Sequence, residues 1–144
     1  MGNLFFIIPL KVIMSIIYNY NKQIVPPGPL INVTVESSDN PEIFISTPAL
    51  IDTGADYTVI TREIFKKLAP LRVGLVYVES FRGEGDFHKL YSVNIKIHNW
   101  EFYLIPVLVG SENYVILGRD LLNNFDLRLN GIDGKLKILR CIQK

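Results

Sequence analysis

One carboxylate of this chain lies in a sequence setting that suits catalysis. Asp52 follows an apolar run at residues 49–51 and precedes Thr53 and Gly54. The apolar run predicts the end of a buried strand, and the Thr-Gly pair predicts a sharp turn directly after it. Such an arrangement would place one acid at the mouth of a hydrophobic core, on backbone that is held rigidly from behind. An acid in that position is suited to general acid–base catalysis.

Two other segments accompany this loop in a recognisable order and spacing. The loop continues as Ala55-Asp56, residues 116–122 read Ile-Leu-Gly-Arg-Asp-Leu-Leu, and residues 81–87 form a charged, glycine-bearing segment between two β-prone runs. From residue 29 to about residue 130, the sequence resembles the retropepsins, the retroviral-type aspartic peptidases. An Asp-Thr-Gly triplet alone also suits an ordinary turn, but the triplet together with the Gly-Arg-Asp motif is specific.

The resemblance implies a fold and an assembly. The fold would be mostly β: a single-lobe retropepsin-like acid protease β-barrel with one or two short helices, acting as a homodimer. One carboxylate cannot act as acid and base at once, whereas two facing carboxylates that share a proton can. The chain has a single Asp-Thr-Gly loop. The second aspartate must therefore come from a second copy, across a two-fold axis.

The resemblance also implies catalytic roles for the residues of the loop. Asp52 of one copy would activate water, and the partner's Asp52 would polarise the scissile carbonyl. Thr53 would lock the two loops through hydroxyl-to-backbone hydrogen bonds. Gly54 would let the substrate backbone approach closely.

The remaining site positions are expected to bind substrate or to support the loop. Asp56 would hold the substrate main chain and pair with Arg119, whose planar guanidinium suits a bidentate bond to a carboxylate. Gly118 and Arg119 are expected to be structural support. The other expected substrate-binding residues line apolar pockets, adjoin the loop or belong to a flap that closes over the peptide; they are Ala55, Val59, Gly83, Gly85, Tyr114 and Ile116. We therefore expect apolar substrate side chains.

The elements that must position these residues are mostly strands. Alternation, β-branched residues and turn signals predict strands at residues 30–36, 42–47, 49–51, 57–60, 73–81, 90–97, 102–109, 114–117, 127–129 and 135–139. A helix is expected at residues 61–68, from the N-cap candidate Thr61 to a stop at Pro70, and a second at residues 119–125. These elements predict one mostly β domain over residues 26–144, which the resemblance implies is retropepsin-like.

Composition narrows the class of function. The chain has 144 residues, of which 49% are hydrophobic, and its formal net charge is +1. This length fits one domain, and the charge gives no reason to expect nucleic acid as a partner. Cys141 is the lone cysteine, which excludes an intramolecular disulfide and a Cys-rich metal site. His88 and His98 lack metal-ligand spacing, and we expect neither metal nor cofactor.

The N-terminal part allows several interpretations. Residues 4–17 are strongly apolar but include Pro9 and Lys11, and they are too short to span a bilayer comfortably. We interpret residues 1–25 as a loosely attached extension, or as the product of a start assigned upstream of a true one at Met14. Membrane contact through residues 4–17 is an open alternative. Without a clear secretory signal, a cytoplasmic location is expected.

Two functions from different classes fit these features. The first is an aspartic endopeptidase that hydrolyses peptide bonds in extended polypeptide through an aspartate dyad formed across a homodimer. The alternative is a non-catalytic peptide-binding or dimerisation module on the same fold. The intact Asp52, Thr53, Gly54 and Arg119 favour the enzyme.

Overall fold

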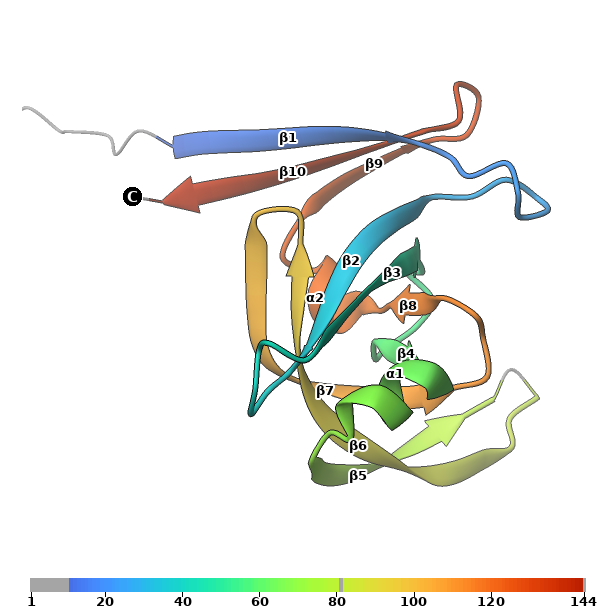
Figure 1. The fold of residues 1–144 in the computed structure, drawn as a ribbon. Coiled ribbons are helices and arrows are strands. Elements are labelled where there is room, and N and C mark those ends of the chain that lie inside the picture. Colours follow the sequence, from blue (N-terminus) through green and yellow to red (C-terminus); the bar gives the residue numbers. More distant parts are fainter. Residues whose placement is uncertain (1–10, 81, 144) are drawn as a thin grey trace, which may run out of the picture. The chain divides into compact units, whose positions relative to one another are not determined.

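The computed structural model describes residues 11–80 and 82–143 and is mostly β, as expected (Figure 1). The strands are β1 (Lys11–Asn19), β2 (Leu30–Ser37), β3 (Phe44–Ile51), β4 (Val59–Thr61), β5 (Arg72–Glu79), β6 (Gly85–Ile97), β7 (Trp100–Gly110), β8 (Val115–Leu117), β9 (Asp126–Asn130) and β10 (Lys135–Gln143), and the helices are α1 (Arg62–Leu68) and α2 (Arg119–Leu122). The described residues thus form two short helices and a large amount of sheet.

Seven strands form one sheet that closes on itself. Their order is β2-β3-β8-β4-β7-β6-β5, and β2 pairs in addition with β6. This extra pairing joins six strands into a barrel, with β5 added alongside β6. The pairs β3–β8 and β4–β7 are parallel, whereas the other pairs are antiparallel. Closure leaves few unpaired edges, and it makes the rigid support on which the loop at Asp52 is carried.

Alternating side chains explain how the barrel is filled. In β2, Ile31, Val33 and Val35 are at most 3% exposed, while the residues between them are more accessible. The alternation at residues 30–36 therefore predicted this strand and its inward face correctly. In β6, Val93 and Ile95 are also buried, but there the neighbouring polar residues Ser92 and Asn94 are buried as well. Burial of such aliphatic side chains is the main favourable term for the fold.

Helix α1 begins and ends where its sequence indicates. The Thr61 hydroxyl oxygen accepts a hydrogen bond from the backbone N–H of Ile64 at 3.2 Å, which caps the first turn. Ala69 adopts a left-handed conformation with φ of 43°, and its N–H donates to the carbonyl of Phe65. Ile64 and Leu68 are the buried residues of this helix. The predicted N-cap is confirmed.

Several element boundaries differ from the expected ones. Strand β3 is continuous across Pro48, where we expected two strands. Strand β6 begins at Gly85 rather than at residue 90, because residues 85–89 pair with β5. Helix α2 ends at Leu122 rather than at residue 125. In each case pairing with another strand, or the start of the next strand, decides the boundary.

A separate three-stranded sheet has the order β1-β10-β9. Strand β1 is antiparallel to β10 along all of its residues, from Lys11 opposite Gln143 to Asn19 opposite Lys135. The expectation of a loosely attached extension is therefore wrong for residues 11–19. Their local sequence does not reveal a partner that comes from the other end of the chain. Residues 4–10 lie outside the described part.

The described chain divides into two compact units. One consists of residues 30–122, and the other is made from residues 1–29 and 123–144 where these are described. This division differs from the expected boundary after residue 25, because the first and last strands pair with each other. All of the expected site residues belong to the 30–122 unit. No helix in the described part of the chain is long and apolar enough to cross a membrane.

Candidate active site

The loop that carries Asp52 is fixed at its start by backbone hydrogen bonds. The N–H of Asp52 donates to the carbonyl of Leu117 at 3.1 Å, and the N–H of Ala55 donates to the carbonyl of Asp52 at 3.3 Å. The first bond continues the parallel pairing of β3 with β8 beyond the last strand residue. The turn after Asp52 therefore has a defined shape that follows directly from the sheet.

The Asp52 carboxylate is oriented by its own loop. The N–H of Gly54 donates to Asp52 Oδ1 at 2.8 Å. A Cβ atom at residue 54 would lie 3.1 Å from the same oxygen, so glycine leaves room for the carboxylate. Asp52 is half-buried, and it forms no ion pair with any residue of the described ranges. Asp52 is therefore an accessible acid that no cation of the described ranges neutralises.

Arg119 holds the far side of the loop. Its Nη1 donates to the Thr53 carbonyl at 2.8 Å, and its Nη2 forms an ion pair with Asp56. The backbone N–H of Arg119 donates to the Ala55 carbonyl at 2.9 Å. The expected pair with Asp56 is present, but the guanidinium is divided between a carbonyl and a carboxylate rather than bidentate on the carboxylate. Arg119 thus fixes the path of the backbone as much as it neutralises a charge.

The pair between Arg119 and Asp56 is more exposed than a supporting ion pair in a core would be. Their side chains are 44% and 71% exposed, respectively. Exposed ion pairs contribute little net stability, because water solvates both charges well. Within one chain, this pair therefore acts mainly by fixing the geometry of the loop, and its Coulomb attraction adds little stability.

A second anchor, which we did not predict from the sequence, connects Thr58 to Asp120. The Thr58 hydroxyl donates to Asp120 Oδ1 at 2.8 Å, and the Thr58 backbone N–H donates to Asp120 Oδ2 at 2.9 Å. The N–H of Gly118 donates to the Thr58 hydroxyl oxygen at 3.2 Å. Thr58 is fully buried. Two features of the sequence could have indicated this anchor: the polar Thr58 lies within an apolar stretch, and the acidic Asp120 lies in the first turn of an expected helix.

Gly118 is needed because two backbone segments meet there. A Cβ atom at residue 118 would lie 2.6 Å from the carbonyl carbon of Tyr57 and 2.7 Å from its oxygen. Real Cβ atoms do not approach backbone so closely. The expected supporting role of Gly118 thus has a steric basis: glycine allows the start of α2 to lie against the residues that follow the loop.

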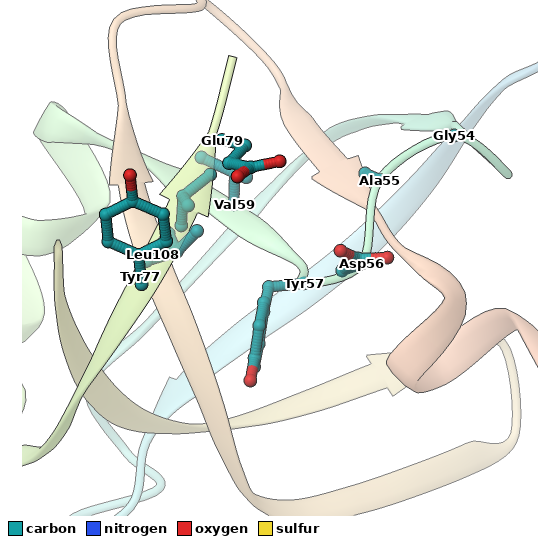
Figure 2. A pocket seen from close by; sticks show the side chains of 9 residues that line it. Gly54, Ala55, Asp56, Tyr57, Val59, Tyr77, Glu79 and Leu108 are labelled. Atoms are coloured by element: carbon teal, nitrogen blue, oxygen red, sulfur yellow. The ribbon is translucent and has the colours of Figure 1, made fainter. Parts of the chain in front are cut away.

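A cavity of about 290 Å³ adjoins the loop (Figure 2). Its walls come from the loop, from β4, from β7 and from the end of β5; they are Gly54, Ala55, Asp56, Tyr57, Val59, Tyr77, Val78, Glu79 and Leu108. The structure therefore brings together the expected substrate-binding residues Ala55, Asp56 and Val59. The lining residues of β5 were not foreseen, although alternation along a strand places Tyr77 and Glu79 on one face.

Two expected pocket residues do not line this cavity. Tyr114 directly precedes β8, and Ile116 lies within β8; both are half-buried. Ile116 is opposite Leu50 in the parallel pair with β3 and opposite Val59 in the antiparallel pair with β4. Their assignment to substrate binding stays a prediction.

The expected flap is a hairpin formed by β5 and β6. Its turn is closed by bonds from the N–H of Gly83 to the Ser80 carbonyl at 2.9 Å and from the N–H of Ser80 to the Glu84 carbonyl at 2.7 Å. Gly83 has φ of +77°, a conformation that glycine adopts without strain. Phe81, the first residue of the expected flap, lies outside the described part of the chain.

Gly85, which we expected to belong to a flap over the substrate, also has a packing role. A Cβ atom there would lie 2.4 Å from the Tyr77 ring. The ring also contacts Phe87 edge-on, with centroids 5.3 Å apart. Gly85 therefore makes room for an aromatic side chain on the neighbouring strand.

The described ranges contain no group of three or more His, Cys, Asp or Glu side chains that could hold a metal ion.

Comparison with known proteins identifies the family. The model of the family described as "gag-polyprotein putative aspartyl protease" matches residues 45–124, which is more than half of the chain. This chain belongs to that family. The resemblance that we described from the sequence is confirmed. A search of curated proteins finds no match.

A solved structure of the same fold class is among the matches. A retropepsin-like aspartic protease from Rickettsia conorii matches with a TM-score of 0.62 and 19% identity, covering 92% of this chain and 95% of that one. The EIAV protease complexed with the inhibitor HBY-793 matches with a TM-score of 0.49 and 24% identity, covering 69% of this chain and 88% of that one. At this level of identity, the Rickettsia match shows the fold: a single-lobe retropepsin-like barrel.

Proposed function

We propose that this chain is an aspartic endopeptidase that cleaves extended polypeptide, and that its active form is a homodimer. Asp52 from each copy would contribute to one dyad across a two-fold axis. The ionised carboxylate would remove a proton from water, which attacks the scissile carbonyl. The protonated carboxyl of the other copy would donate its hydrogen bond to the carbonyl oxygen.

The observation that carries this proposal is the way Asp52 is held. The N–H of Gly54 orients the Asp52 carboxylate. Arg119, the cation that contacts the loop, binds the Thr53 carbonyl and Asp56 instead of Asp52. Here the support and the reacting group are separate side chains, as general acid–base catalysis requires.

The neighbouring cavity supports a peptide as the substrate. It begins at Gly54 and Ala55 and is lined by apolar, aromatic and acidic side chains. A cavity next to an oriented acid can hold one substrate side chain and so place a peptide bond near the carboxylate. Asp56, which is exposed, is available to accept hydrogen bonds from the substrate main chain.

The test is hydrolysis of an unstructured protein such as casein, with Asp52→Asn as the decisive variant. We expect cleavage by the wild-type chain and none by the variant. The matched control is Asp39→Asn, the same chemical change at an exposed position in the turn between β2 and β3, which should cleave as wild type does. Binding of an extended peptide without cleavage, at every concentration tested, would instead support the non-catalytic module.

A further inference from the structure

Among the described residues, the cavity beside the loop is lined by two acidic side chains and by no basic one. Asp56 comes from the loop and Glu79 from the end of β5, and the remaining walls are apolar, aromatic or glycine. Figure 2 shows Asp56 and Tyr57 on the loop side of the pocket and Glu79 with Tyr77 on the strand side. The charge around a substrate side chain in this cavity is therefore negative, which the apolar substrate expected from the sequence does not explain.

The two carboxylates differ in how far they are already neutralised. Asp56 is paired with Arg119. Glu79 is exposed, and within residues 11–80 and 82–143 its side chain forms neither an ion pair nor a hydrogen bond. Its backbone is held opposite Gly85 in the β5–β6 hairpin. Glu79 therefore carries an unneutralised carboxylate on a backbone that is held at the wall of the cavity.

The other walls complement a long side chain that ends in a cation. Val59 and Leu108 offer an apolar surface for an aliphatic stem, and long basic side chains commonly bury their stems in this way. The rings of Tyr57 and Tyr77 offer faces that attract a cation. A volume of about 290 Å³ suits one side chain rather than a larger ligand.

We propose that this cavity selects substrates that carry Lys or Arg at one fixed position relative to the scissile bond, and that Glu79 determines this specificity. An uncharged side chain of the same length would cover the Glu79 carboxylate without giving it a partner, which is unfavourable. An acidic side chain would be repelled. This inference rests on the proposed endopeptidase function, because it describes which peptides that site accepts.

The first measurement is the sequence of the cleavage sites. Digestion of an unstructured protein by the wild-type chain, followed by mass spectrometry of the products, should show Lys and Arg enriched, and Asp and Glu depleted, at one position near the cut. A peptide built on the preferred site is then compared with its norleucine counterpart, which keeps the length of lysine but lacks the charge.

Variants of Glu79 test whether this residue is responsible. Glu79→Gln should lower kcat/KM for the lysine peptide by about fivefold, the effect of one exposed ion pair, and should not lower kcat/KM for the norleucine peptide. Glu79→Lys should favour a peptide with Glu at that position. The control is Glu84→Gln, in the same hairpin but not at the cavity, which should keep the wild-type preference.

The outcomes separate the two proposals. Cleavage without a basic preference, or a basic preference that persists in Glu79→Gln, overturns the role of Glu79 and leaves the endopeptidase standing. No cleavage by the wild-type chain, with products equal to those of Asp52→Asn, overturns the endopeptidase and with it the specificity. A preference that is lost in Glu79→Gln and reversed in Glu79→Lys supports both.

Discussion

Thr58 and Asp120, which are far apart in the sequence, are joined by two hydrogen bonds of 2.8 and 2.9 Å. Both Asp120 oxygens accept from Thr58, one from the hydroxyl and one from the backbone N–H. Oδ1 also accepts from the N–H of Leu121 at 2.9 Å. The start of α2 is thereby connected to the chain that follows the Asp52 loop, so the geometry of the site depends on a contact outside it.

Asp120→Asn should destabilise the fold by about 1–2 kcal/mol. An amide has one acceptor oxygen, and its NH₂ group would face the donating N–H of Thr58. The measurement is urea unfolding of Asp120→Asn, Thr58→Val and the double variant. A clear coupling energy between the two positions is expected; strictly additive losses would show that the two residues do not interact.

Arg119→Met should reduce stability more than Asp56→Asn does. The arginine variant loses bonds to both Thr53 and Asp56, whereas Asp56→Asn keeps the bond from Arg119 to the Thr53 carbonyl. Because the ion pair is exposed, Asp56→Asn should cost less than about 1 kcal/mol. Thermal unfolding of the two variants gives the comparison. Equal losses would indicate that Arg119 acts only through Asp56.

Gly118→Ala should destabilise the chain by about 3 kcal/mol, because the added methyl group would overlap the backbone of Tyr57. Backbone atoms cannot move aside as the end of a flexible side chain can. The control is Gly131→Ala, where nothing lies within 4 Å of the added atom. Denaturant unfolding of both variants is the measurement, and similar stabilities would contradict the close approach at residue 118.

Local sequence patterns were sufficient where local physics decides the structure. Alternation identified β2 and its buried face, and the hydroxyl of Thr61 identified the start of α1. The loop at Asp52 and the motif at Arg119 could be matched because residue type and order are both local. The side chains that those motifs contact directly, such as Asp56, were therefore within reach of the sequence.

Local sequence patterns could not predict the contacts between distant segments. Nothing near residues 11–19 indicates that their ladder partner is β10. The bonds between Thr58 and Asp120, and the arrival of Glu79 at the cavity, also require the three-dimensional path of the chain. The divided guanidinium of Arg119 is a further example, since its choice between a carbonyl and a carboxylate depends on the shape of the turn.

Tyr103→Phe should raise the pKa of Glu101. The Tyr103 hydroxyl donates to the Glu101 carboxylate, and this bond, followed by the bond and charge of Lys96, lowers the pKa of Glu101 below its ordinary value of 4.5. A depressed carboxyl pKa contributes stability above pH 4.5 that is lost as pH falls through the folded-state pKa. The variant should show less of this acid-dependent loss.

The measurement for Tyr103→Phe is an NMR titration of the Glu101 side-chain carboxyl carbon. Tyr91→Phe, at a ring that instead contacts Phe65, is the control and should leave the Glu101 titration unchanged. An identical titration in Tyr103→Phe and wild type would show that the Tyr103 hydroxyl does not donate to Glu101 in solution.

Mixing wild-type and Asp52→Asn chains should suppress activity more strongly than dilution does. If each active site needs Asp52 from two copies, an equal mixture with free exchange of subunits leaves only about a quarter of the dimers with both aspartates. Peptide cleavage is measured at constant wild-type concentration while the variant is added in increasing amounts, and sedimentation reports the dimer content of each mixture.

Specific activity of the wild type alone should also fall on dilution, since dissociation removes the complete site. Asp39→Asn chains keep Asp52, so adding them in the same way should raise cleavage as added wild-type chains would. Activity that depends only on the amount of wild-type chain, however much Asp52→Asn is added, would show that one copy carries a complete site and that the shared dyad is wrong.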